Sequence, residues 1–245
     1  MRLPATTDVL VVGGGVAGRS AAVFTARAGL ETAVADAGGA LLRRNAHLEN
    51  FPGFPAGVNA RLLLELLADQ LETAGASLVD AEVTDLEWTA DGFVARTADG
   101  DETRARRVIA ASKNEVGYLD GLDGVELVDE GKAFVATDDR GRTGVDGLYA
   151  AGRLAQKPHQ AVVCAGHGAE VAVTLLEDAE RPFYHDWVAP TGYFTGRGRE
   201  VPPGCEEIDE AEFRRREAAS RAAMRSYFAE PHPELPEQHP SAAGE

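Results

Sequence analysis

The chain has 245 residues, 44% of them hydrophobic, which is enough for one large domain or two small ones with a sizeable core. Its formal net charge of −16 argues against nucleic acid and anionic membranes as partners, and predicts a solvated, repulsive surface of the halophilic type. The chain lacks a C-x-x-C, a long apolar run and a signal-peptide pattern, so we expect a cytoplasmic protein without a disulfide scaffold, zinc site or membrane span.

Residues 8–36 (DVLVVGGGVAGRSAAVFTARAGLETAVAD) carry the clearest functional pattern. The apolar, β-branched run at 9–12 is typical of a buried parallel strand, and it leads directly into residues 13–18, which match G-x-G-x-x-G. A helix of small residues and a second short strand follow, and Asp36 ends that strand. This strand, turn, helix and acid order favours dinucleotide binding over a glycine-rich turn of purely structural use.

Each of these residues has a physical task in that interpretation. Gly13 permits the tight turn, Gly15 lets a pyrophosphate approach the backbone, and Gly18 lets the helix pack closely on the strand. The helix N-terminus offers unpaired N–H groups and a partial positive charge to the phosphates. Asp36 accepts hydrogen bonds from ribose hydroxyls and repels a 2′-phosphate, which makes NADP an unfavourable ligand of this first site.

The middle of the chain predicts a helix and several strands. Residues 38–55, rich in Gly and Pro, form either a loop shaped to fit a ligand or an ordinary surface connection. Leucines at helical spacing predict an amphipathic helix over 59–74, with Asn59 as its N-cap. Turn signals predict a three-stranded antiparallel meander over 78–105, followed by a separate parallel strand at 107–111.

The last part of the chain alternates again between strands and helices. Strands are expected at 133–137 and 148–151, and a helix from Pro158-His159-Gln160 to Asp178. Residues 181–206 have no periodicity, and a last helix is expected over 209–228. We expect the chain to fray from Pro231 onward.

Four segments, read together, match one family: residues 13–18 with Asp36, residues 38–41 (GGAL) followed by 49–55 (ENFPGFP), residues 108–112 (VIAAS), and residues 147–152 (GLYAAG) with the helix that follows. The chain thus resembles, over roughly 8–178, the FAD-binding domain of the low-molecular-weight thioredoxin reductases. The resemblance implies an α/β, three-layer FAD/NAD(P)-binding Rossmann-like domain at 1–180, with a parallel sheet and an antiparallel β-meander. Residues 181–245 would be a C-terminal extension that acts as a lid or an oligomer interface.

The same resemblance implies FAD as the cofactor. It places Asn50 beside the flavin ring, the backbone at Val83 near the adenine, and the helix N-terminus at Gln160 and Ala161 against the flavin pyrimidine edge. A helix N-terminus there would stabilise negative charge on a reduced flavin. The expected cofactor-binding residues are Gly13, Gly15, Val16, Ala17, Gly18, Asp36, Ala37, Leu41, Asn50, Val83, Ala111, Gly152, Arg153, Gln160 and Ala161.

The departures from the family are as informative as the matches. The family carries an NADPH domain with a second glycine motif and a redox C-x-x-C between the two halves of its FAD domain, whereas here a short linker follows Ser112. Arg153 stands where the family has an Asp that binds the ribityl chain. Arg cannot accept a hydrogen bond, but it can reach a phosphate or the carboxylate of a redox partner.

Candidate catalytic residues are few. Cys164 lies in the first turns of the helix expected to face the flavin and shares a face with His167, an arrangement that can stabilise a thiolate or support a disulfide with Cys205. The alternative is that Cys164 is an inert buried residue and Cys205 an exposed loop residue. His159 and His47 are candidates for contact with flavin or substrate, or are simply structural.

The sequence therefore predicts an FAD-dependent oxidoreductase that exchanges electrons with a docked or small-molecule donor. The alternative is a non-catalytic flavin-binding sensor or assembly subunit. A redox protein and a second copy of the chain are possible partners. Trp187, Tyr193 and Phe194 are expected to cover the flavin or to form a dimer interface, the alternative being simple packing.

Overall fold

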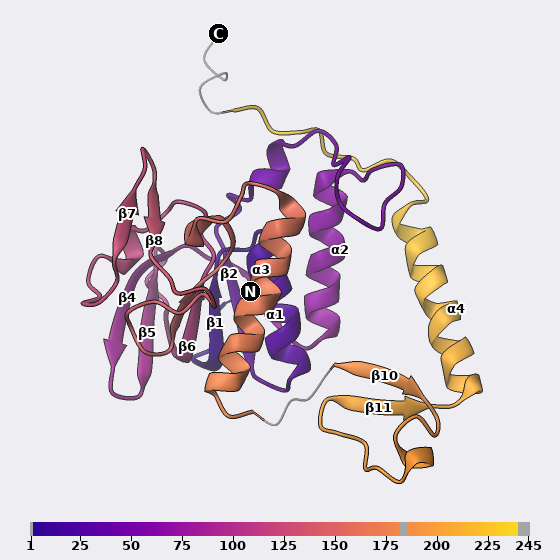
Figure 1. Ribbon diagram of the computed structural model, residues 1–245. Helices are drawn as coiled ribbons and strands as arrows, with labels where there is room; N and C mark the ends of the chain where they lie inside the picture. The colour runs from indigo at the N-terminus through magenta and orange to yellow at the C-terminus, as the bar shows by residue number, and fades with distance from the viewer. Residues whose placement is uncertain (1, 182–185, 240–245) are drawn as a thin grey trace.

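The computed structural model describes residues 2–181 and 186–239, and its centre is a seven-stranded mixed sheet in the order β3-β2-β1-β6-β5-β4, with β9 paired to β6 (Figure 1). Strands β1, β2, β3, β6 and β9 are joined by parallel pairings, and β4, β5 and β6 form an antiparallel meander. This confirms the predicted fold class. The strands are β1 Thr6–Val12, β2 Thr32–Asp36, β3 Ser77–Asp80, β4 Val83–Thr89, β5 Gly92–Thr97, β6 Glu102–Ala110 and β9 Leu148–Ala150.

Three helices cover one face of the sheet, and shorter elements cover the other. Figure 1 shows α1 between α2 and α3 on the first face, and the hairpin of β7 and β8 on the opposite side. Alternation along β1 explains these layers, since Val9 and Val11 pack against the helices while Leu10 and Val12 pack with Tyr118. The bounds are α1 Val16–Arg27, α2 Ala60–Thr73, α3 Ala161–Asp178, β7 Leu127–Asp129 and β8 Ala133–Val135, with 3-10 turns at Leu41–Arg44, Gly117–Leu119 and Gly152–Ala155.

Two boundaries in the sheet differ from the prediction. Residues 78–80 belong to β3, which pairs in parallel with β2, so the meander comprises only β4, β5 and β6. The parallel strand predicted at 107–111 is the second half of the long strand β6, which pairs with β1 on one edge and with β5 and then β9 on the other. The cause is tertiary, because β2 needs a partner on its free edge and only β3 supplies one.

The C-terminal segment stands beyond α2, away from the sheet (Figure 1). Strands β10 Trp187–Pro190 and β11 Cys205–Ile208 pair in parallel, and after them comes α4 Glu210–Tyr227; a 3-10 turn lies at Thr195–Arg197. The prediction had no element in 181–206 and put Cys205 in an exposed loop, whereas Cys205 starts a strand and is half-buried.

Residues 232–237 are held against the body, contrary to the fraying expected there, and residues 240–245 lie outside the described residues. The Nε2 atom of His232 lies 3.0 Å from Oε1 of Glu65 on α2, and the N–H of Glu237 donates to the carbonyl of Arg43 at 2.9 Å. None of the helices in the described part of the chain is long and apolar enough to cross a bilayer.

Candidate functional site

The turn between β1 and α1 needs glycine at three positions for steric reasons. Gly13 has a φ of +114°, and a Cβ atom at Gly18 would lie 1.9 Å from the carbonyl oxygen of Gly13. A Cβ at Gly14 would lie 2.2 Å from Cγ of Asp36. At Gly15, by contrast, an added Cβ would meet no atom within 4 Å. The turn is thus packed tightly on its protein side and open at Gly15, where α1 begins without a side-chain cap.

Asp36 ends β2 beside this turn, and both of its carboxylate oxygens already accept a hydrogen bond. Oδ1 accepts from the backbone N–H of Gly38 at 2.9 Å, and Oδ2 accepts from Nη2 of Arg19 at 3.0 Å. Sequence reasoning did not single out Arg19. The available signal was a charged residue in the middle of a run of small, buried residues at the start of α1.

A cavity of about 850 Å³ extends from the glycine turn across the carboxyl ends of the parallel strands. It is lined by every predicted cofactor-binding residue except Gly18 and Gly152. Those two glycines pack behind it, Gly18 against Gly13 and Gly152 against Ala17. A cavity at this edge of a parallel sheet is where α/β proteins generally bind ligands. Arg44 and Tyr118, which sequence reasoning did not pick out, also line it.

The other end of the cavity is formed by the loop before α2 and the start of α3. Nδ2 of Asn50 donates to Oε1 of Gln160 at 2.8 Å, which joins the two segments. Gln160 precedes the first residue of α3, and no side chain caps that helix. The first N–H groups of α3 are therefore available near Ala161, which lines the cavity with Leu41 and Asn50.

Two cations lie between these ends. Arg153 lines the cavity and is held by Nε, which donates to Oδ1 of Asn114 at 3.0 Å, with its guanidinium 5.9 Å from the ring centre of Phe134. Lys113 also lines the cavity, and its φ of +66° is unusual for a residue with a side chain. Burial and then the charge of Arg153 lower the pKa of His159, a third lining residue. Arg153 and Lys113 can therefore attract anionic groups, although the carboxylate of Glu115 lines the cavity as well.

Cys164 and His167 do not form the thiolate pair that the sequence suggested. Burial raises the pKa of the Cys164 thiol, and no disulfide joins Cys164 to Cys205. Burial also lowers the pKa of His167 to about 4, and its Nδ1 accepts a hydrogen bond from the N–H of Gly152 at 2.9 Å. A neutral imidazole cannot stabilise a thiolate by charge, so the structure favours a packing role for Cys164, although its side chain reaches the cavity wall.

The aromatic residues of the C-terminal segment pack with one another rather than over the cavity. Ring centres of Trp187 and Tyr193 are 4.8 Å apart, and those of Tyr193 and Phe194 are 5.0 Å apart. None of the three lines the cavity, so this structure gives no support to a lid formed by them. Tyr184, at the start of the same tail, is outside the described residues. His47 is also absent from the cavity wall and pairs with Glu49 at 2.7 Å.

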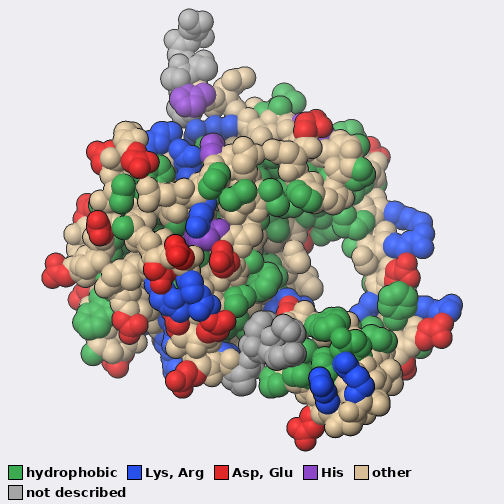
Figure 2. Space-filling model, in the orientation of Figure 1, with side chains coloured by type: hydrophobic (Ala, Val, Ile, Leu, Met, Phe, Trp, Pro, Cys, Tyr) green, Lys and Arg blue, Asp and Glu red, His purple; other side chains and the backbone are tan. Residues whose placement is uncertain are grey.

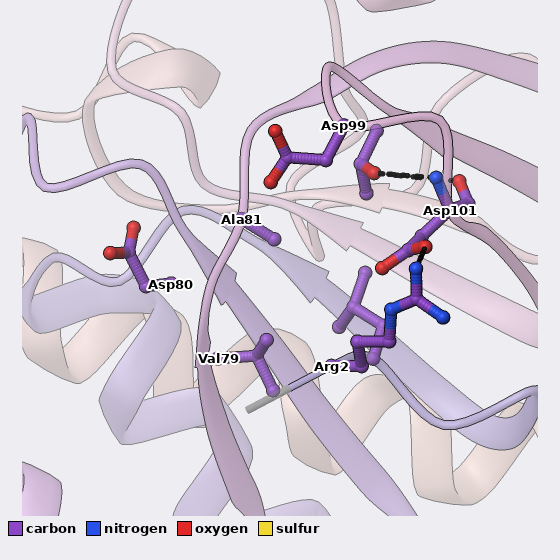
Figure 3. A pocket seen from close by; sticks show the side chains of 8 residues that line it. Arg2, Val79, Asp80, Ala81, Asp99 and Asp101 are labelled. Carbon is purple, nitrogen blue, oxygen red and sulfur yellow. Dashed lines mark hydrogen bonds and ion pairs between the residues drawn. The ribbon is translucent and has the colours of Figure 1, made fainter.

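Outside the cavity lie a dispersed charged surface (Figure 2) and a smaller pocket. Figure 2 shows acidic side chains scattered over the visible face rather than gathered in one patch. A small pocket of about 160 Å³ lies where β3 ends and shares Ala81 with the large cavity; across it Arg2 and Asp101 form an ion pair of 2.8 Å, with Asp80 and Asp99 nearby (Figure 3). Among the described residues, no group of His, Cys, Asp or Glu side chains is arranged to hold a metal ion.

Sequence comparison finds thioredoxin reductases among the relatives of this chain. No family model matches the chain. The thioredoxin reductase of Aquifex aeolicus is 38% identical over 108 residues, which are 43% of this chain and 33% of that protein. The thioredoxin reductase of Rickettsia felis is 28% identical over 178 residues, which are 72% of this chain and 57% of that protein. The chain thus spans less than two thirds of the length of these relatives.

The fold comparison points the same way. The thioredoxin reductase of Gloeobacter violaceus matches with a TM-score of 0.67 at 18% identity, covering 73% of this chain and 97% of that one. That of Streptococcus pyogenes matches with a TM-score of 0.65 at 16% identity, covering 72% and 99%. The chain is similar to thioredoxin reductases over about 70% of its length. It contains only two cysteines, Cys164 and Cys205, and no C-x-x-C.

Proposed function

We propose that this thioredoxin reductase-like chain binds FAD in the large cavity and is an FAD-dependent oxidoreductase. The observation that supports this most strongly is the continuity of the cavity, which joins the glycine turn and Asp36 at one end to Asn50 and the start of α3 at the other. A dinucleotide with a phosphate bridge between two ring systems has the matching order of groups. In this proposal residues 1–180 are the FAD-binding domain and 181–245 an extension.

The residues present suit the chemistry of each part of FAD. The open side of Gly15 and the uncapped start of α1 would receive the pyrophosphate, which the nearby cations Lys113 and Arg153 would help to neutralise. Asp36 would accept hydrogen bonds from the ribose. When bound, FAD supplies the electron-transfer chemistry, while the protein supplies binding and electrostatics. The N-terminus of α3 would stabilise negative charge at the flavin end.

The electron donor in this proposal is a small molecule or a separate protein. Residues 111–147 connect β6 to β9 and contain only the turn at Gly117–Leu119 and the hairpin of β7 and β8. A connection of this size cannot contain a nucleotide-binding βαβ unit together with the rest of a domain. The chain between the two halves of the site therefore offers no place for a bound nicotinamide.

Anaerobic reduction of the FAD-loaded protein tests this proposal. Dithionite is expected to bleach the flavin absorbance, whereas NADH and NADPH at equal concentration are expected to bleach it far more slowly, because no nicotinamide site faces the flavin. Rapid, saturable bleaching by either nicotinamide would contradict the proposed donor. A reduced flavin that passes electrons to no acceptor, including quinones and dyes, would favour the sensor function instead.

A further inference from the structure

Arg19 connects the glycine turn with two neighbouring segments of the chain. It lies in the first turns of α1 and is only 4% exposed. Its Nε donates to the carbonyl of Gly14 at 2.6 Å, its Nη1 to the carbonyl of Leu64 on α2 at 2.5 Å, and its Nη2 to Oδ2 of Asp36 at 3.0 Å. One guanidinium therefore links the turn, α2 and the end of β2.

Burial of the charged Arg19 side chain carries a desolvation free energy that needs an explanation. The side chains of Arg19 and Asp36 are only 5% and 12% exposed, so both charges are largely removed from water. Burial lowers the pKa of Arg19, while Asp36 opposes that shift, and a guanidinium stays charged at any physiological pH. An apolar side chain would pack α1 against α2 without this desolvation cost. Packing alone therefore does not explain the choice of arginine.

The geometry of Asp36 shows what the ion pair accomplishes. With Gly38 bonded to Oδ1 and Arg19 to Oδ2, the carboxylate cannot rotate freely about its terminal bond. Gly14 lies so close to it that a Cβ there would be 2.2 Å from Cγ of Asp36. The carboxylate is thus fixed against the glycine turn. Each of its oxygens keeps a lone pair for a ligand in the cavity that Asp36 lines.

We propose that Arg19 is a positioning residue that aims the Asp36 carboxylate at the ribose of an adenine dinucleotide and thereby sets the preference for a free 2′-hydroxyl. This inference rests on the proposed FAD function, because it needs an adenosine diphosphate group at the glycine turn. The same contact with Gly14 orients the peptide groups next to the phosphates. Without Arg19, Asp36 would keep only the bond from Gly38 and would sample several orientations.

The test compares ligands that differ in one hydroxyl. FAD uptake by the wild-type protein is measured first, and then the dissociation constants of ADP and 2′-deoxy-ADP for the apoprotein by calorimetry. A hydrogen bond to a charged acceptor corresponds to about a tenfold preference for ADP in the wild type. Arg19→Met is expected to reduce this preference to about twofold or less, since the acceptor loses its orientation.

Arg61→Met is the matched control. Arg61 is 3% exposed and donates to the carbonyls of Asn45 and Ala46, but it has no contact with Asp36. Its loss is expected to change stability while the preference for ADP stays at about tenfold. The variant Arg19→Lys keeps the charge and the stem, but one ammonium cannot reach all three acceptors, so its preference should fall to about threefold.

The outcomes separate the two proposals. If the wild type takes up no FAD, the proposed function is wrong. The proposed positioning role of Arg19 is wrong if the wild type takes up FAD but binds ADP and 2′-deoxy-ADP equally, or if Arg19→Lys keeps the full preference for ADP. Either result leaves the proposed FAD function standing. Should Arg19→Met fail to fold, the result with Arg19→Lys decides the question.

Discussion

Replacement of Gly15 by Ala separates the needs of the fold from the needs of the ligand. Gly15 has a φ of −76°, which alanine adopts without strain, and an added Cβ would meet no protein atom within 4 Å. The loss of unfolding free energy should therefore stay below about 1 kcal/mol, the usual difference between Gly and Ala at a helix N-cap. The same methyl group would occupy the space through which a phosphate reaches the N–H groups of α1.

The expected loss of affinity follows from the bonds that the methyl group displaces. One charge-assisted hydrogen bond to a phosphate corresponds to about 2 kcal/mol, so Gly15→Ala should weaken FAD binding about thirtyfold. Quenching of FAD fluorescence on binding to the apoprotein measures this, with denaturant unfolding as the parallel stability assay. Gly15→Glu should abolish FAD retention, because its carboxylate would replace and repel the phosphate. Wild-type affinity in Gly15→Ala would refute the assigned phosphate turn.

Three more variants test other parts of the site. Arg153→Gln should lower FAD affinity about tenfold and reduce its salt dependence, measured by the same titration at two salt concentrations; an unchanged affinity would show that Arg153 does not face the phosphates. His167→Asn keeps an acceptor for the N–H of Gly152 but removes the titrating group. The wild type holds this imidazole neutral while its unfolded chain binds a proton below pH 6.5, so from pH 6.5 to 4 the wild type should lose roughly 2 to 3 kcal/mol more unfolding free energy than the variant. Equal slopes in denaturant titrations would contradict the buried neutral His167. Cys164→Ser should leave the flavin content unchanged, whereas a marked loss of bound flavin would assign Cys164 a role beyond packing.

Local patterns predicted the part of the site that lies within one continuous stretch. The strand at β1, the glycine turn and Asp36 follow one another within residues 8–36, and the turn depends on Gly13, Gly14 and Gly18, where a Cβ atom would clash. The N-cap at Asn59, whose side chain accepts from the N–H groups of Arg61 and Leu62, was equally local. Such features need no knowledge of the rest of the chain.

Features that depend on distant partners were missed or misplaced. Strand β3 was assigned to the meander because its pairing with β2 involves residues more than 40 positions apart, which no local pattern reports. The parallel pair of β10 and β11 was missed for the same reason, since each strand is short and their partner residues lie 18 positions apart. Arg19 was overlooked because its role depends on Leu64 and Asp36, which only the fold brings together.

FAD binding in the large cavity is the central claim, and reconstitution measures it directly. Apoprotein mixed with excess FAD and then desalted should retain about one FAD per chain, with a flavin absorption spectrum that differs from that of free FAD. Parallel samples with FMN, which lacks the adenosine and the second phosphate, should retain almost none. A chain that retains no FAD, or that retains FMN equally well, would contradict the account.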